Sequence, residues 1–127
     1  MYSISVWTHL NPAAGALWLN EIARVLRPGG LALISTSSHG QLAKHRAHKE
    51  RQVLWADVTD QQLDREGIIF RGAPVDKWGG VTYGCTVHTA DWVRQEWSKV
   101  MPVTETRVRA IGAAEGGSQD LNIMVKA

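Results

Sequence analysis

The stretch WLNEIARVLRPGGLALIST, Trp18 to Thr36, decides the fold class of this chain. Apolar residues recur at helical spacing until Pro28-Gly29-Gly30, and the next segment, Leu31 to Ser35, is apolar at four of five positions. A strand this apolar is typical of a sheet that is covered on both faces. The sequence therefore predicts a helix-to-strand crossover in an open α/β sheet.

The flanking segments predict further elements of the same sheet. A short strand is expected over Tyr2 to Val6, and Asn11-Pro12 starts the helix that runs to Leu26, because Asn caps free amides and Pro suits the first helical position. The polar segment Ser37 to Glu66 is expected to be helical in pieces. The remaining expected elements are a hairpin of Ile68–Phe70 and Val81–Val87, a helix that Thr89 caps and Pro102 ends, and two closing strands, Val103–Ile111 and Asp120–Val125.

Composition limits the classes of function. A chain of 127 residues suits one domain, and its net charge of +2 is far from the concentrated positive surface of nucleic-acid-binding proteins, so no nucleic-acid partner is expected. The single cysteine, Cys85, excludes an internal disulfide and fits a reducing compartment. No apolar run approaches the ~20 residues of a membrane span, and the N-terminus does not resemble a signal peptide. We therefore expect a cytoplasmic protein without a membrane partner.

Two further blocks carry a family resemblance. SVWTHL, Ser5 to Leu10, precedes the helix, and TYGCTVHTADWVRQEW, Thr82 to Trp97, follows the crossover. Together with the deciding stretch, they resemble the second half of class I S-adenosylmethionine-dependent methyltransferases of the small-molecule type. Over essentially the whole chain, the resemblance implies a partial Rossmann-like α/β fold in one truncated domain, 1–127. Its mixed sheet would have about four strands, in the family's order 4-5-7-6, with flanking helices. Residues 37–88 would form an insertion similar to a substrate lid.

The resemblance does not extend to the family's cofactor-binding half. There, a Gly-rich loop after the first strand and an acidic residue after the second hold the cofactor. The Gly pairs of this chain have no GxGxG spacing, and the few residues before SVWTHL leave no room for the missing strands. The resemblance implies S-adenosylmethionine as the cofactor, with Ser5 and Trp7 beside it if the site is completed. The isolated chain is not expected to bind it.

The resemblance also implies a set of site residues. His9 would be a general base that takes a proton from a hydroxyl or amine as this group attacks the methyl group, and its alternative role is a cap or packing residue at the strand-to-helix turn. The implied substrate-binding residues are expected to converge on one cleft beside His9. They are His39, Tyr83, His88, Gln119 and Asp120. Each of them is alternatively an ordinary turn, cap or hairpin residue.

Two spacings are typical of zinc ligands, His45-x2-His48 and Cys85-x2-His88. The first pair lies in a run of Lys and Arg that is typical of a solvated helical face, and Cys85 lies in an apolar strand. We expect no metal site. No partner residues in a known arrangement surround Cys85, so nucleophilic catalysis by this thiol is not expected either.

Three functions remain open from the sequence. The first is a methyltransferase-derived binding or interaction module without catalysis of its own. The second is a methyltransferase for an oxygen or nitrogen of a small molecule, completed by a missing N-terminal half or a partner chain. The third is a gene fragment without an independent role. Without the family's first strands, Tyr2 to Val6 is an uncovered edge, so we expect a homodimer through this edge and the Trp18 helix.

Overall fold

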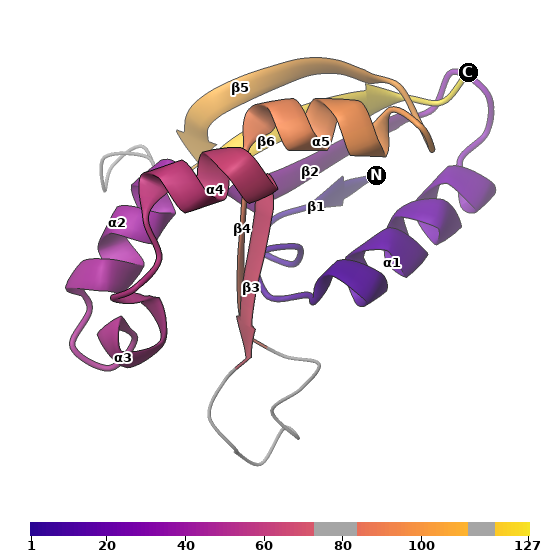
Figure 1. Ribbon diagram of the computed structural model, residues 1–127. Coiled ribbons are helices and arrows are strands. Elements are labelled where there is room, and N and C mark those ends of the chain that lie inside the picture. Colours follow the sequence, from indigo (N-terminus) through magenta and orange to yellow (C-terminus); the bar gives the residue numbers. More distant parts are fainter. Residues whose placement is uncertain (73–83, 112–118) are drawn as a thin grey trace.

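The computed structural model describes residues 1–72, 84–111 and 119–127 (Figure 1). The chain combines helices and strands in one sheet-containing unit, as the sequence predicts for an α/β protein. The elements, in chain order, are β1 (Tyr2–Ser3), α1 (Pro12–Val25), β2 (Leu31–Ser37), α2 (His39–Ala47), α3 (Gln52–Trp55), α4 (Asp60–Glu66), β3 (Ile68–Gly72), β4 (Gly84–His88), α5 (Ala90–Trp97), β5 (Val103–Ile111) and β6 (Gln119–Val125).

The strand β2 is the centre of a mixed, six-stranded sheet. On one side it pairs antiparallel with β6, which pairs antiparallel with β5. On its other side, β1 pairs parallel with its first half, where Tyr2 lies opposite Leu33. The strand β4 pairs parallel with its end, where Val87 lies opposite Ser37, and β3 joins β4 antiparallel. The mixed α/β sheet is confirmed.

The expected number of about four strands is too small. The predicted lid-like insertion, residues 37–88, includes the β3–β4 hairpin, whereas β4 pairs with β2 and belongs to the sheet. The Thr86 amide donates to the Thr8 carbonyl at 2.8 Å, and the Gly84 amide donates to the His9 carbonyl at 3.2 Å. These two bonds join β4 to the segment after β1. They provide partners for the backbone carbonyls of that segment, which lies beyond the end of β1.

The first strand ends earlier than predicted. It covers Tyr2–Ser3 and not Tyr2 to Val6, because Ser5 has a φ of 59° and its amide donates to the Ser35 hydroxyl at 2.8 Å instead of to a neighbouring strand. A non-glycine residue in this left-handed region turns the chain away from the extended path. The turn leaves Ile4 and Val6 exposed and carries Trp7 into the core.

The predicted first helix is confirmed as α1. The Asn11 side chain accepts a hydrogen bond from the Ala14 amide at 2.8 Å, and Pro12 occupies the first turn. Leu19 and Ile22 are buried against the sheet, but Trp18 is 56% exposed. The apolar stripe of this helix is therefore wider than the face that the sheet covers.

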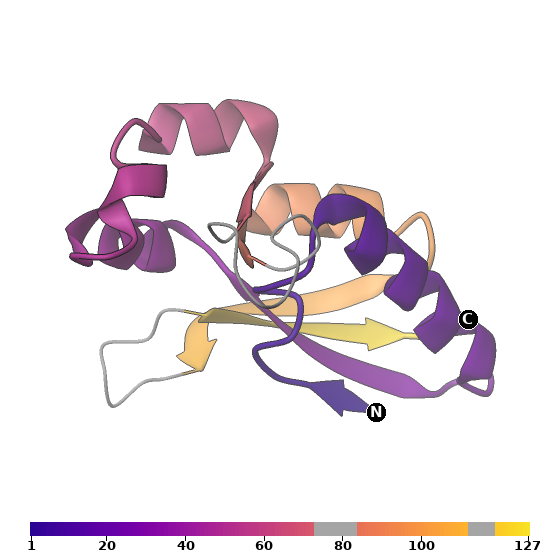
Figure 2. The same cartoon turned by 90° about the horizontal axis from the view of Figure 1, so that it is seen from below.

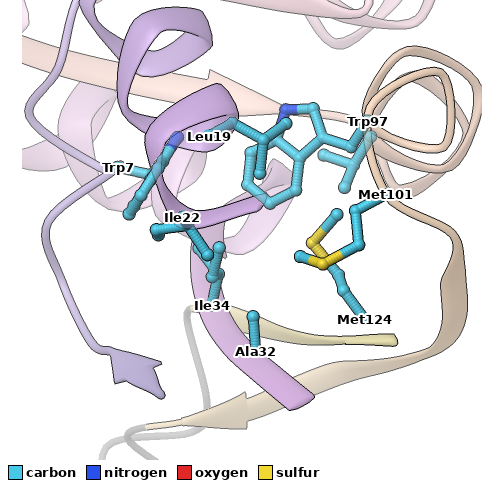
Figure 3. Packing of buried hydrophobic residues seen from close by; sticks show 9 residues of the cluster. Trp7, Leu19, Ile22, Ala32, Ile34, Trp97, Met101 and Met124 are labelled. Carbon is cyan, nitrogen blue, oxygen red and sulfur yellow. The ribbon is translucent and has the colours of Figure 1, made fainter. Parts of the chain in front are cut away.

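The first core cluster lies between the sheet and the helices α1 and α5. Figure 3 shows Leu19 and Ile22 from α1, Ile34 from β2 and Trp97 from α5 pointing toward one another. The rings of Trp7 and Trp97 meet edge to face with centroids 5.9 Å apart. This packing fixes the two helices on the same face of the sheet (Figure 2).

The prediction that helices cover both faces of β2 is wrong for the face opposite α1 and α5. Figure 2 shows no described helix on that side of β2, β5 and β6. Leu31 is 52% exposed and Leu33 is half-buried. Ser35, which comes next on this face, donates its hydroxyl to Gln119 at 2.7 Å. Side chains alternate between the two faces of a strand, so an apolar run does not by itself show that both faces are covered.

A second core cluster joins α2, α3 and α4 to the β3–β4 hairpin. Trp55 is 1% exposed, and His45 stacks on its ring with centroids 4.9 Å apart. The segment is helical in pieces, as predicted. The other buried members of this cluster are Leu42, Val58, Leu63, Ile69 and Val87. In the described part of the chain, no helix has both the length and the apolar composition needed to cross a bilayer.

Candidate functional site

A small polar cavity lies where β1 and β2 end and the chain enters α1 and α2. Its volume is about 120 Å³, which leaves room for a small polar group or a few waters. The residues that line it are almost all polar, and they come from segments far apart in the sequence: Ser5, Thr8, His9, Ser37, Gln41, His45, Arg51, Cys85 and Gln119. We call it the polar cavity. Its place beyond the strand ends is typical of ligand sites in open α/β sheets.

One wall of the polar cavity is a network of hydroxyls and an amide. The Gln119 side chain donates to the Ser5 hydroxyl at 2.9 Å, and its carbonyl oxygen accepts from the Ser35 hydroxyl at 2.7 Å. Gln119 begins β6 directly opposite Ser37, so the sheet register places it at this strand end. The network joins β2, β6 and the turn after β1 into one surface.

His9 also lines the polar cavity, and a hydrogen bond defines its orientation. Its Nδ1 donates to the Gly84 carbonyl at 2.8 Å, because a carbonyl oxygen can only accept. In the neutral imidazole, Nε2 then carries a lone pair and no proton. A ring nitrogen in this state can take a proton from a hydroxyl or amine. The general-base role of His9 remains a prediction.

His45 and Cys85 are uncharged near neutral pH. Burial, with the positive charge of Arg51 as the next cause, lowers the pKa of His45 to about 4. Burial also raises the pKa of the Cys85 thiol, although Arg51 acts in the opposite direction. A thiol that stays protonated is a poor nucleophile and a poor metal ligand. Among the described residues, no group of three or more His, Cys, Asp or Glu side chains is arranged to hold a metal ion.

The strand geometry of β4 separates the two members of the suggested zinc pair. Cys85 and His88 are three residues apart, and side chains of a strand alternate between its faces. Cys85 accordingly lines the polar cavity, whereas His88 lies on the α5 side of the sheet. The two side chains cannot share one ion.

Thr8 brings an unused hydrogen-bonding group to the polar cavity. Its Oγ1 is buried and has no partner among the residues that the structure describes. Buried hydroxyls are nearly always bonded, since an unbonded one costs free energy. This atom therefore marks a position that suits a water molecule or a polar group of a ligand.

The predicted site residues do not share one cavity. Ser5, His9 and Gln119 line the polar cavity. His39 and Asp120 line a second cavity of about 350 Å³ next to α4 and α5, where His39 Nε2 lies 2.7 Å from Asp64 Oδ1. Two other predicted site residues, Trp7 and His88, line a third cavity between α1 and α5. The last one, Tyr83, falls outside the described residues.

Some residues of the polar cavity were not among the predicted site residues. Ser37 had a signal in the sequence, because a hydroxyl at the end of an apolar strand is typical of a ligand crevice. Gln41, His45 and Arg51 had no signal for this cavity, since the His45-x2-His48 spacing indicated a zinc site instead. They come from α2 and the turn after it, and only the packing of Trp55 against His45 brings that segment to the cavity.

No protein-family model, curated protein or solved structure matches this chain.

Proposed function

We propose that this chain is a methyltransferase-like binding and interaction module that does not catalyse methyl transfer on its own. Three sequence blocks support the family assignment, together with the pairing order β1, β2, β6, β5, in which β6 is antiparallel to both neighbours. The resemblance implies this order for the second half of the family's Rossmann-like sheet. The sequence itself contains no GxGxG loop for the cofactor. A cytoplasmic location, without membrane or nucleic-acid partners, belongs to the same proposal.

An apolar groove between β1 and α1 carries the interaction part of the proposal. Its volume is about 600 Å³. Tyr2, Trp18 and Val25 line it and are 78%, 56% and 54% exposed. Contiguous exposed apolar side chains are typical of interaction surfaces, because covering them removes apolar area from water. We call this surface the β1–α1 groove.

The proposed occupant of the β1–α1 groove is a second copy of the chain. The strand β1 pairs only with β2 among the described residues, so its other edge offers backbone donors and acceptors. A two-fold axis brings the same edge and the same groove of two copies together, and no second protein is needed. Because β1 has only two residues, α1 side chains such as Trp18 must supply most of the contact.

Sedimentation velocity at low micromolar concentration tests the dimer. The expected mass is twice the 14.0 kDa of one chain. Ile4→Lys or Trp18→Lys should shift the equilibrium to monomer, because a charge then has to be buried at the contact. Val53→Lys is the matched control, since Val53 is 83% exposed on α3 and does not line the groove. A wild-type chain that sediments as a monomer contradicts the dimer.

The second candidate is a small-molecule O- or N-methyltransferase that a missing N-terminal half or partner chain completes. The polar cavity supports it, because His9 presents Nε2 as a base beside Ser5 and Gln119. In this candidate, Ser5 and Trp7 lie against S-adenosylmethionine, and His39, Tyr83, His88 and Asp120 serve the substrate.

Calorimetric titration with S-adenosylmethionine tests the first candidate. The first predicts no binding by this chain alone at a cofactor concentration of about 1 mM. Tight, stoichiometric binding favours the second and overturns the first. In that case His9→Gln should lower kcat by about 10²- to 10⁴-fold while cofactor affinity stays the same, because a general base acts on the reacting proton only.

A further inference from the structure

The cavity between α1 and α5 is walled by aromatic rings. Its volume is about 310 Å³, which is within the range of small-molecule pockets. Trp7, Trp92 and Trp97 contribute to its lining, with Leu10 and Ile68 between them. We call it the tryptophan cavity. The Trp7 and Trp97 rings meet edge to face at an interplanar angle of 63°, so the three indole rings give the cavity an apolar aromatic lining.

The walls of the tryptophan cavity are held in place by specific contacts. The Trp7 indole Nε1 donates to the Gly15 carbonyl at 3.2 Å, and a Cβ at Gly15 would come within 3.3 Å of the same nitrogen. Trp92 packs directly over Gly67, where an added Cβ would come within 2.7 Å of the Trp92 Cβ. The two rings therefore keep their positions without a ligand, and a preformed pocket lowers the entropic cost of binding.

His88 is the polar member of this wall. It is 3% exposed, and its Nδ1 is buried with no hydrogen-bond partner among the described residues. The ring lies against Trp92 and Trp97, with centroid separations of 5.6 Å and 6.0 Å. Because His88 is among the lining residues, its imidazole is the polar ring beside the Trp92 and Trp97 indoles that a ligand in the cavity would meet.

The charge of His88 selects among ligands. Burial lowers the pKa of this histidine to about 3, so the ring is neutral near pH 7 and offers one N–H and one lone pair. A neutral polar group matches this ring better than an ion does. The charged pair of Lys99 and Glu96, 2.6 Å apart, lies at the cavity lining on α5 and in the turn after it, and its two charges compensate each other.

We propose that the tryptophan cavity binds a neutral, planar aromatic molecule whose one hydrogen-bonding group meets the His88 imidazole. The indole rings make the apolar contacts with the ligand. His88 makes the cavity prefer a ligand that carries a hydrogen-bonding group. The site shares no lining residue with the polar cavity. Its lining differs from that of the β1–α1 groove except at Trp7 and Leu10, which contribute to both. It does not depend on methyltransferase chemistry or on a dimer.

Indole is the probe, and indene is its matched control because it has the same bicyclic shape without an N–H. Ligand-observed NMR titration of the full chain measures both affinities, which avoids the overlap of indole with tryptophan fluorescence. Indole should bind about tenfold more tightly than indene, the ratio expected for one buried hydrogen bond. No indole binding at about 1 mM overturns the proposal.

Two substitutions on α1 locate the bound probe. Ala16 lines the cavity and is exposed, so Ala16→Phe should obstruct it and weaken indole binding by at least about tenfold. Ala13→Phe is the control, because Ala13 is also exposed on α1 but does not line this cavity. Equal binding by the two variants would place the probe elsewhere and overturn the proposal.

The variant His88→Phe tests the selection. It keeps a flat ring in the wall and removes both nitrogens, so indole and indene should bind with equal affinity. A retained preference for indole overturns the role of His88. If this variant does not fold, the comparison of Ala16→Phe with Ala13→Phe still decides whether the cavity is the binding site.

Discussion

Lowering the pH from about 7 to about 5 should destabilise the folded chain by about 4 kcal/mol through two buried histidines. His88 and His45 have pKa values of about 3 and about 4, both below the ordinary value of 6.5. Both side chains are 3% exposed. Burial disfavours the charged imidazolium in each case, and the positive charge of Arg51 adds to this effect at His45.

The direction of this change in stability follows from the number of protons that the folded and the unfolded chain bind. Between pH 6.5 and about 4, the unfolded chain binds a proton at each histidine and the folded chain does not. Protons therefore favour the unfolded chain. Stability is fully present above the unfolded pKa and falls as the pH drops through this window, by about 2 kcal/mol for each histidine at about pH 5.

Urea unfolding at the two pH values measures this loss. His88→Phe should remove about half of it, because the phenylalanine ring does not titrate. His48→Gln is the control, since His48 is exposed. If His88→Phe shows the same pH dependence as the wild type, His88 does not titrate as a buried neutral group.

Replacing Gly67 by alanine should cost about 2–4 kcal/mol of the free energy of unfolding. Gly67 ends α4 with a φ of 76°, and its amide donates to the Leu63 carbonyl at 2.7 Å. An alanine is strained in this left-handed region. Its Cβ would also come within 2.6 Å of the Trp92 Cγ, so the indole on α5 must move.

Gly29→Ala provides a matched control for the backbone cost. Gly29 has the same φ of 76°, but an added Cβ meets nothing within 4 Å. This variant should lose about 1 kcal/mol, which is the conformational cost alone. Chemical denaturation of both variants gives the difference. Equal losses of unfolding free energy in the two variants would show that the contact with Trp92 does not constrain Gly67.

The local elements of the fold follow from the sequence because their signals are local. Asn11-Pro12 starts α1 and Thr89 starts α5 through side-chain bonds to amides three residues on. The apolar run after Gly30 specifies β2. The end of the first strand, β1, could not be predicted in the same way. Ser5 adopts a left-handed conformation only because Ser35, thirty residues away, accepts its amide.

The candidate site was only partly predictable. Of the residues expected in one cleft beside His9, only Gln119 lines the polar cavity with it, because the sheet register places Gln119 at the end of β2. His88 was expected in the same cleft. The pairing of β4 beside β2 instead turns it to the α5 face, and the alternation of side chains along β4 leaves Cys85 on the opposite face.

The sequence by itself determined the α/β class, the helix starts and the central apolar strand, because capping residues and apolar periodicity act over a few neighbours. Only the tertiary structure decided which face of each strand meets a helix and which side chains share a cavity. Pairing register and hairpin placement control those outcomes, and one added residue of register turns a side chain to the other face. Trp7, Trp92 and Trp97 line one cavity with His88 only after α1 and α5 pack on the same face of the sheet.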